Sequence, residues 1–115
     1  MKEPCVYILA TRHNGTLYIG VTSDIYGRMV EHKQGLIEGF TKKYGIKLLV
    51  YYGMHDDMDA AILREKRLKE WQRAWKMRLI ESMNPEWKDL FDEATGKLLA
   101  GPSDVQRGID RTANG

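Results

Sequence analysis

The fold of this chain is decided by residues 5–22, which read CVYILATRHNGTLYIGVT. Two runs rich in β-branched and aromatic residues, 5–11 and 16–22, flank a short polar segment that contains Asn14 and Gly15. Asn-Gly is the strongest short signal for a β-hairpin, because a type I′ turn needs positive φ at both central residues. The sequence therefore predicts two antiparallel strands joined by a tight turn.

The predicted turn sets the register of the hairpin and the faces of its strands. A turn centred on Asn14 and Gly15 places Tyr7 opposite Thr22, and opposed residues share a face of the sheet. One face is then apolar, is predicted to be the core face, and carries Val6, Ile8, Ala10, Leu17, Ile19 and Val21. The other face is predicted to leave room above a glycine, and it carries Tyr7, Leu9, Tyr18 and Gly20.

The rest of the chain predicts helices around a third strand. Thr22, Ser23 and Asp24 offer N-cap side chains for a helix over 24–34 that ends near Gly35. The glycine-punctuated segment 35–45 is predicted to contain a short helical turn over 40–44, and residues 47–53, KLLVYYG, are predicted to form the third strand of an antiparallel sheet. We expect an α/β (α+β) fold in which helices flank a central three-stranded antiparallel sheet.

A long helix is predicted to begin at the acidic residues 56–59, which suit the positive N-terminal end of a helix dipole. It is expected to run until Pro85, with Trp75 in the core. Its inward-facing stripe follows spacings of three and four and consists of Ala61, Glu65, Leu68, Gln72 and Trp75. Glu65 is anomalous in that stripe, because a buried carboxylate must pair with a base or bind a cation.

Length and composition bound the class of protein. The 115 residues, 43% apolar and 30% charged, fit one domain with one modest core. We expect a folded domain over residues 1–91 and a loosely ordered tail over 92–115. No apolar run approaches the roughly 20 residues that cross a bilayer, so we expect a cytoplasmic protein. The net charge of +2 alone does not indicate a nucleic-acid binder.

Two tripeptides in the hairpin carry a resemblance to a known family. Cys5-Val6-Tyr7, ten further residues and then Tyr18-Ile19-Gly20 resemble the paired signature of the GIY-YIG nucleases, and the match continues in order through Arg28, His32, Glu65 and Asn84. It covers roughly residues 5–91. Residues 68–76, LKEWQRAWK, with 84–87, NPEW, further resemble a branch of short, free-standing bacterial members. At Cys5 the chain departs from the glycine of the family name.

The resemblance implies a role for each matched residue. Tyr7 and Tyr18 would lie near the nucleophile, one as general base and the other orienting water or phosphate, which requires a metal ion or an arginine that favours phenolate. Arg28 would bind phosphate oxygens, and His32 could accept or relay a proton. Asn84 would hold the site by hydrogen bonding.

The carboxylate of Glu65 could hold one Mg²⁺ or Mn²⁺ ion together with water and substrate phosphate. Its structural alternative is a salt bridge to Arg64 or Lys69. For Arg28 the alternative is a surface ion pair with Asp24 or Glu31. In the same way, strand tyrosines usually pack, a lone helix histidine is usually inert, and an asparagine before proline usually stops a helix.

These patterns lead to one main hypothesis and two alternatives. The main one is a metal-dependent endonuclease that hydrolyses phosphodiester bonds in DNA, structure-guided or weakly sequence-specific, in DNA repair or processing, with a protein partner for targeting. RNA stays open as a substrate, as does the oligomeric state. The expected nucleic-acid-binding surface contains Lys66, Lys69, Arg73 and Lys76. The alternatives are a binding module with little or no turnover and a protein-interaction domain that uses Trp71 and Trp87.

Overall fold

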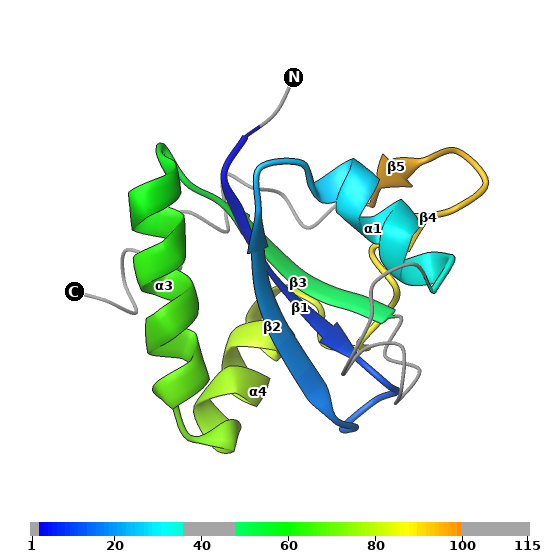
Figure 1. Ribbon diagram of the computed structural model, residues 1–115. Coiled ribbons are helices and arrows are strands. Elements are labelled where there is room, and N and C mark those ends of the chain that lie inside the picture. Colours follow the sequence, from blue (N-terminus) through cyan, green and yellow to red (C-terminus); the bar gives the residue numbers. More distant parts are fainter. Residues whose placement is uncertain (1–2, 36–47, 100–115) are drawn as a thin grey trace.

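The computed structural model describes residues 3–35 and 48–99. It confirms the expected α+β fold with a three-stranded antiparallel sheet, in which β1 is the central strand and the order is β2-β1-β3 (Figure 1). The predicted turn over 40–44 lies outside the described residues. In chain order the elements are β1 (Cys5–Ala10), β2 (Leu17–Thr22), α1 (Ile25–Lys33), β3 (Leu48–Met54), α3 (Met58–Glu70), α4 (Arg73–Met83), β4 (Phe91–Asp92) and β5 (Lys97–Leu98).

Helices cover both faces of the sheet. Figure 1 shows α3 and α4 on one side of the sheet and α1, with the small β4–β5 hairpin, on the other. The face predicted to be the core packs against α3 and α4 through Ala61, Leu68, Leu79 and Ile80. The opposite face is also a core, because Tyr7 and Leu9 are fully buried there against α1 and β4. The expectation of one modest core was therefore wrong, since a central strand such as β1 is buried on both faces.

The hairpin forms as predicted, but its register differs by two residues. Tyr7 lies opposite Gly20, not opposite Thr22. Asn14 has positive φ (59°) whereas Gly15 does not, and the amide of Gly15 donates to the carbonyl of Arg12 at 2.9 Å. A longer loop thus replaces the two-residue type I′ turn, which needs positive φ at both residues. A shift by two residues preserves the faces, so both tyrosines stay on one side as predicted.

The helix after the hairpin has the predicted start and end. Asp24 is its N-cap, and its side chain accepts a hydrogen bond from the amide of Gly27 at 3.2 Å. Gly35 follows the helix with φ of 70°, in the left-handed region that glycine tolerates. The sequence rules for capping were sufficient here because the capping contacts are local.

The predicted single long helix is two helices. The chain leaves α3 after Glu70, passes through Trp71 and Gln72 with extended ψ values of 150° and 148°, and begins α4 at Arg73. The stripe that continued from Leu68 to Trp75 is therefore broken. Trp75 is 45% exposed, so its expected place in the core was wrong.

The C-terminal part of the described chain is more ordered than predicted. Trp87, Leu90 and Phe91 are buried, and β4 pairs with β5. The amide of Leu99 donates to the carbonyl of Leu90 at 2.6 Å. The predicted tail boundary at residue 92 thus falls inside a hairpin, while residues 100–115 lie outside the described part. Among the described residues, no helix has the length and apolar character needed to cross a membrane.

Candidate active site

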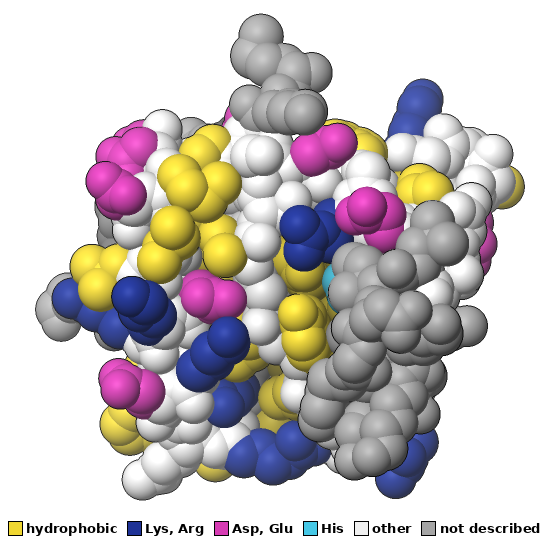
Figure 2. Space-filling view, viewed as in Figure 1, with side chains coloured by type: hydrophobic (Ala, Val, Ile, Leu, Met, Phe, Trp, Pro, Cys, Tyr) yellow, Lys and Arg dark blue, Asp and Glu magenta, His cyan; other side chains and the backbone are white. Residues whose placement is uncertain are grey.

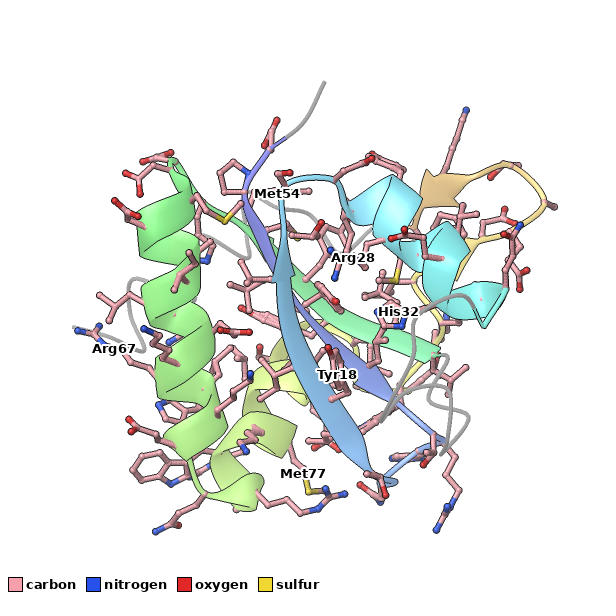
Figure 3. The ribbon with its side chains drawn as sticks, viewed as in Figure 1. Tyr18, Arg28, His32, Met54, Arg67 and Met77 are labelled. Atoms are coloured by element: carbon pink, nitrogen blue, oxygen red, sulfur yellow. The ribbon has the colours of Figure 1, made fainter. Side chains whose placement is uncertain are left out.

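Three aromatic side chains from the hairpin and α1 meet on one face of the sheet. The Tyr7 hydroxyl and Nε2 of His32 are within hydrogen-bond distance at 3.2 Å, although 25 residues separate them in sequence. The His32 ring centroid lies 5.8 Å from that of Tyr7 and 5.8 Å from that of Tyr18. Figure 3 shows Tyr18, His32 and Arg28 between β2 and α1. The predicted juxtaposition of hairpin and helix is therefore present.

Gly20 makes room for the Tyr7 ring. A Cβ atom at position 20 would lie 2.4 Å from the Tyr7 hydroxyl and 2.5 Å from the ring carbon that carries it. The space predicted above this glycine is thus filled by the phenol. Glycine is required here because any side chain would displace Tyr7 and, with it, the contact to His32.

Arg28 lies one turn before His32 on α1. Its guanidinium forms an ion pair with Glu31, Nε to Oε1 at 3.3 Å, and its side chain is 34% exposed. Arg28 and Glu31 also line a polar hollow of about 400 Å³ together with the backbone and side chains at the start of α1. The surface ion pair proposed from the sequence is present, and the arginine remains accessible to an anion.

Burial sets the protonation of the two hydrogen-bonded groups. It raises the pKa of Tyr7 above its ordinary value, Tyr18 raises it further, and the Arg28 guanidinium opposes the shift only in part. Burial therefore favours the neutral phenol of Tyr7 over the phenolate. Burial, followed by the positive charge of Arg28, lowers the pKa of His32 to about 4. At neutral pH the imidazole is uncharged and can accept a proton.

Glu65 lies on α3, which packs on the face of the sheet opposite α1 (Figure 1). Its side chain is 16% exposed, and Lys69 Nζ lies 3.2 Å from its Oε2. Lys69, Lys76 and Tyr18 line a hollow of about 250 Å³ at the edge of β2. Because β2 is an edge strand of the described sheet, Tyr18 and Lys69, the ion-pair partner of Glu65, can line the same hollow. The salt bridge with Lys69 is the structural alternative considered for Glu65.

A divalent metal ion at this place would have Glu65 as its protein ligand. The described residues contain no group of three or more His, Cys, Asp or Glu side chains placed to hold an ion. Magnesium is commonly held by one or two carboxylates, with water and substrate phosphates completing its shell. A partly exposed carboxylate beside an open hollow fits that mode of binding.

Comparison with known proteins identifies the family of the chain. A family model described as the GIY-YIG catalytic domain matches residues 3–78. The chain belongs to the GIY-YIG family. Its fold is therefore of the nuclease type, as the paired tripeptides indicated. The GIY-YIG model ends before Asn84, so the role predicted for this residue from the resemblance stays a prediction.

Curated relatives of this GIY-YIG domain are short proteins. The UPF0213 protein of Staphylococcus saprophyticus is 34% identical over 80 residues, which cover 70% of this chain and 96% of the relative. The UPF0213 proteins of Staphylococcus haemolyticus and of Staphylococcus aureus strain Mu3 are 32% and 34% identical over 81 residues, with 70% of this chain and 98% of each relative covered. No solved structure gives a significant match.

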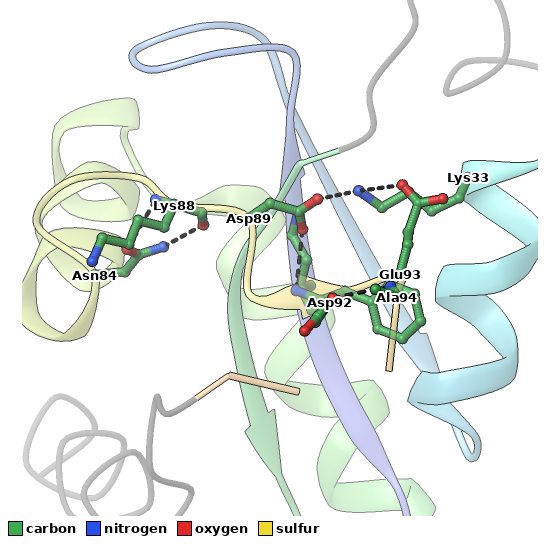
Figure 4. A network of polar contacts seen from close by, with 9 residues as sticks. Lys33, Asn84, Lys88, Asp89, Asp92, Glu93 and Ala94 are labelled. Atoms are coloured by element: carbon green, nitrogen blue, oxygen red, sulfur yellow. Dashed lines mark hydrogen bonds and ion pairs between the residues drawn. The ribbon is translucent and has the colours of Figure 1, made fainter. Parts of the chain in front are cut away.

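Asn84 lies away from the aromatic cluster, at the end of α4. Its amide nitrogen donates to the carbonyl of Val50 at 3.0 Å. It also donates to the carbonyl of Lys88 at 2.9 Å, and its oxygen accepts from the amide of Lys88 at 3.0 Å (Figure 4). It is 4% exposed. In this GIY-YIG domain Asn84 thus ties the turn after α4 to β3, and it supports the sheet that carries the site.

The four predicted nucleic-acid-binding residues lie in three different surroundings. Lys69 and Lys76 line the hollow at the edge of β2, and Figure 2 shows Lys and Arg side chains gathering where α3 and α4 approach this strand. Arg73 instead donates to the carbonyls of Asn14 and Gly15, at 2.8 and 2.6 Å, and so tethers the hairpin loop. Lys66 is exposed on α3.

The sequence reasoning missed one polar network near the site. Lys33, the residue after His32, forms an ion pair with Asp89 (Figure 4). The two residues are 56 positions apart, so no local spacing rule connects them. Only the packing of β4 against α1 brings these charges together.

Proposed function

We propose that this GIY-YIG domain is a divalent-metal-dependent endonuclease that cleaves phosphodiester bonds in DNA, with structure-guided or weak sequence specificity. The observation that carries the proposal is the contact between Tyr7 and His32, beside Tyr18 and Arg28. Tyr18 also lines a hollow with Lys69, the ion-pair partner of Glu65. Activation of the water and stabilisation of charge on the phosphoryl oxygens, two requirements of phosphodiester hydrolysis, then have candidate residues.

The uncharged imidazole is the proton acceptor of the proposed mechanism. Tyr18 lines the hollow and orients the attacking water, while the buried Tyr7 hydroxyl bridges toward His32. As the water oxygen attacks phosphorus, its proton would pass to the Tyr7 hydroxyl while the proton of Tyr7 passes to Nε2 of His32, which becomes imidazolium. The P–O bond to the leaving oxygen would break, and that oxygen would take a proton from solvent water. This relay does not need a resting phenolate, which the raised pKa of Tyr7 disfavours.

Cationic side chains from α1 and from the edge of β2 would bind the phosphate. The planar guanidinium of Arg28 suits two phosphate oxygens, and Lys69 and Lys76 offer point charges across the edge of β2. Glu65 would hold the metal ion, which when bound neutralises charge on the phosphoryl oxygens. An arriving phosphate attracts Lys69 and so weakens its hold on Glu65.

Replacement of Glu65 tests the proposal directly. We expect Glu65→Gln to lower the rate of cleavage about 100-fold or more, because it removes the negative charge that holds the metal ion. The assay incubates purified protein with branched, nicked and single-stranded DNA in the presence of Mg²⁺ or Mn²⁺. Glu70→Gln is the matched control, since it removes the same charge from an exposed position on the same helix. No cleavage of any substrate, or equal cleavage by the parent and Glu65→Gln, would contradict the proposal.

The ion pair of Glu65 with Lys69 also supports a second candidate, a nucleic-acid-binding module with little turnover. In that function Lys69 would satisfy the carboxylate permanently, at 3.2 Å as observed. The expected result is salt-sensitive binding of DNA or RNA that survives both Glu65→Gln and removal of divalent metal by a chelator. Binding that is lost under either condition would exclude this candidate.

A further inference from the structure

The C-terminal turn of α1 is held by an ion pair that is mostly buried. Lys33 is the last residue of α1, and its side chain is 9% exposed. Its ammonium group lies against the carboxylate of Asp89, whose side chain is 25% exposed, and Glu93 Oε1 is 3.9 Å away. Loss of one partner of such a pair leaves a charge in poor contact with water, which is costly.

One carboxylate joins three elements at this place. While one oxygen of Asp89 contacts Lys33, the other accepts hydrogen bonds from the amides of Leu49 in β3 and Phe91 in β4, both at 3.1 Å (Figure 4). The amide of Leu90 also donates to the carbonyl of Leu49 at 2.7 Å. These hydrogen bonds fix Asp89 to the sheet. The ion pair with Lys33 then holds the end of α1 in place relative to the sheet.

We propose that Asp89 is a positioning residue which, through Lys33, holds His32 against Tyr7. Lys33 directly follows His32, so a rotation of this helical turn would move the imidazole away from the hydroxyl 3.2 Å from it. Asp89 lies beyond residues 3–78, the part that the family model matches. The segment after that part thus contributes to the candidate site without contacting substrate.

The titration of His32 reports on its position. Among the described residues, the groups that face the ring include Tyr7 from β1, Tyr18 from β2 and, along its own helix, Arg28. In the intact protein burial disfavours the imidazolium, and the pKa is lowered to about 4. When the turn of α1 is released, water reaches the ring, so its pKa rises toward the ordinary value of about 6.5.

Asp89→Asn isolates the ion pair from the hydrogen bonds. The amide oxygen of asparagine can still accept from Leu49 and Phe91. The carboxylate in contact with Lys33 is gone, and the more distant, largely exposed carboxylate of Glu93 remains. Asp92→Asn is the matched control, because Asp92 lies on the same hairpin and its carboxylate accepts from the amide of Ala94 instead. NMR titration of the histidine ring nitrogens in the full chain should show the His32 midpoint raised by about one unit or more in Asp89→Asn only.

A double variant separates positioning from stability. Asp89→Asn with Lys33→Met leaves no unpaired charge, so thermal stability should recover relative to Asp89→Asn while the His32 midpoint stays raised. Lys33→Arg keeps the pair and should keep the midpoint low. A midpoint near 4 in Asp89→Asn, or one restored together with stability in the double variant, would overturn the proposal.

The catalytic part of the inference rests on the proposed function. We expect kcat for DNA cleavage to fall about tenfold in Asp89→Asn with little change in KM, because the relay is misplaced while the phosphate-binding side chains remain. If the parent cleaves no DNA, the proposed function fails, yet the NMR titration still decides whether Asp89 positions His32. If the parent cleaves DNA and Asp89→Asn does so with the same kcat, the catalytic role of this contact is wrong.

Discussion

The buried imidazole of His32 should make the stability of the domain depend on pH. In the unfolded chain a histidine titrates near 6.5, whereas in the folded protein the pKa of His32 is lowered to about 4. Between these values the unfolded chain binds the extra proton, so stability is lost as the pH falls through this window. We expect a loss of about 1–2 kcal/mol between pH 7.5 and pH 5.

Urea unfolding at the two pH values measures this loss. His32→Gln should remove the part of this loss that depends on the histidine. His13→Gln, at an exposed position of the hairpin loop, should show the same loss as the parent. An equal pH dependence in all three proteins would show that carboxylates rather than His32 determine the acid sensitivity.

Single residues differ in how far the sequence alone predicts them. Tyr7 and Tyr18 could be placed on one face because strand periodicity survives a register shift of two residues. The protonation of Tyr7 could not be predicted, since it depends on the complete burial that α1 and β4 provide. Asp89 was missed for a related reason: its partner Lys33 is 56 positions away, and nothing local marks the pair.

The junction between α3 and α4 is an element whose stability can be improved. Gln72 is the N-cap of α4, and its side chain makes no capping hydrogen bond. Its φ of −61° and ψ of 148° are extended, as an N-cap requires. We expect Gln72→Asp to raise the free energy of unfolding by about 0.5–1 kcal/mol, because the new carboxylate can accept from the amides of the first turn.

Chemical denaturation of the parent, Gln72→Asp and Gln72→Ala tests this expectation. Alanine cannot cap, so it should give no gain. If alanine stabilised the protein as much as aspartate, the effect would come from the loss of glutamine and not from capping.

This junction also shows why the element boundary was mispredicted. The apolar spacing from Leu68 to Trp75 fits one helix, and neither Trp71 nor Gln72 is a strong helix breaker. The break depends on tertiary contacts: the Arg64 guanidinium lies 4.9 Å from the Trp71 ring centroid, and Arg73 donates to the hairpin loop. By contrast, the start of α1 was predictable because Asp24 caps it locally.

At the scale of the whole molecule, the proposed binding of DNA would depend on the distribution of charge, because the net charge is only +2. Lys69 and Lys76 line the hollow at the edge of β2, whereas Lys88 and Lys97 are exposed elsewhere, on the turn after α4 and on β5. Each phosphate contact contributes about 0.7–0.9 to the slope of log K against log salt concentration. If phosphate binds at the hollow beside β2, then of these two pairs only Lys69 and Lys76 should contribute to the slope.

Two double variants with equal net charge decide this point. We expect Lys69→Met with Lys76→Met to reduce the salt slope of DNA binding by about 1.4–1.8, measured by fluorescence anisotropy from low to moderate salt. Lys88→Met with Lys97→Met should leave the slope near that of the parent, although it removes the same two charges. Equal reductions in both variants would mean that DNA binding depends on the overall electrostatic field of the protein. The edge of β2 would then not be the specific nucleic-acid interface.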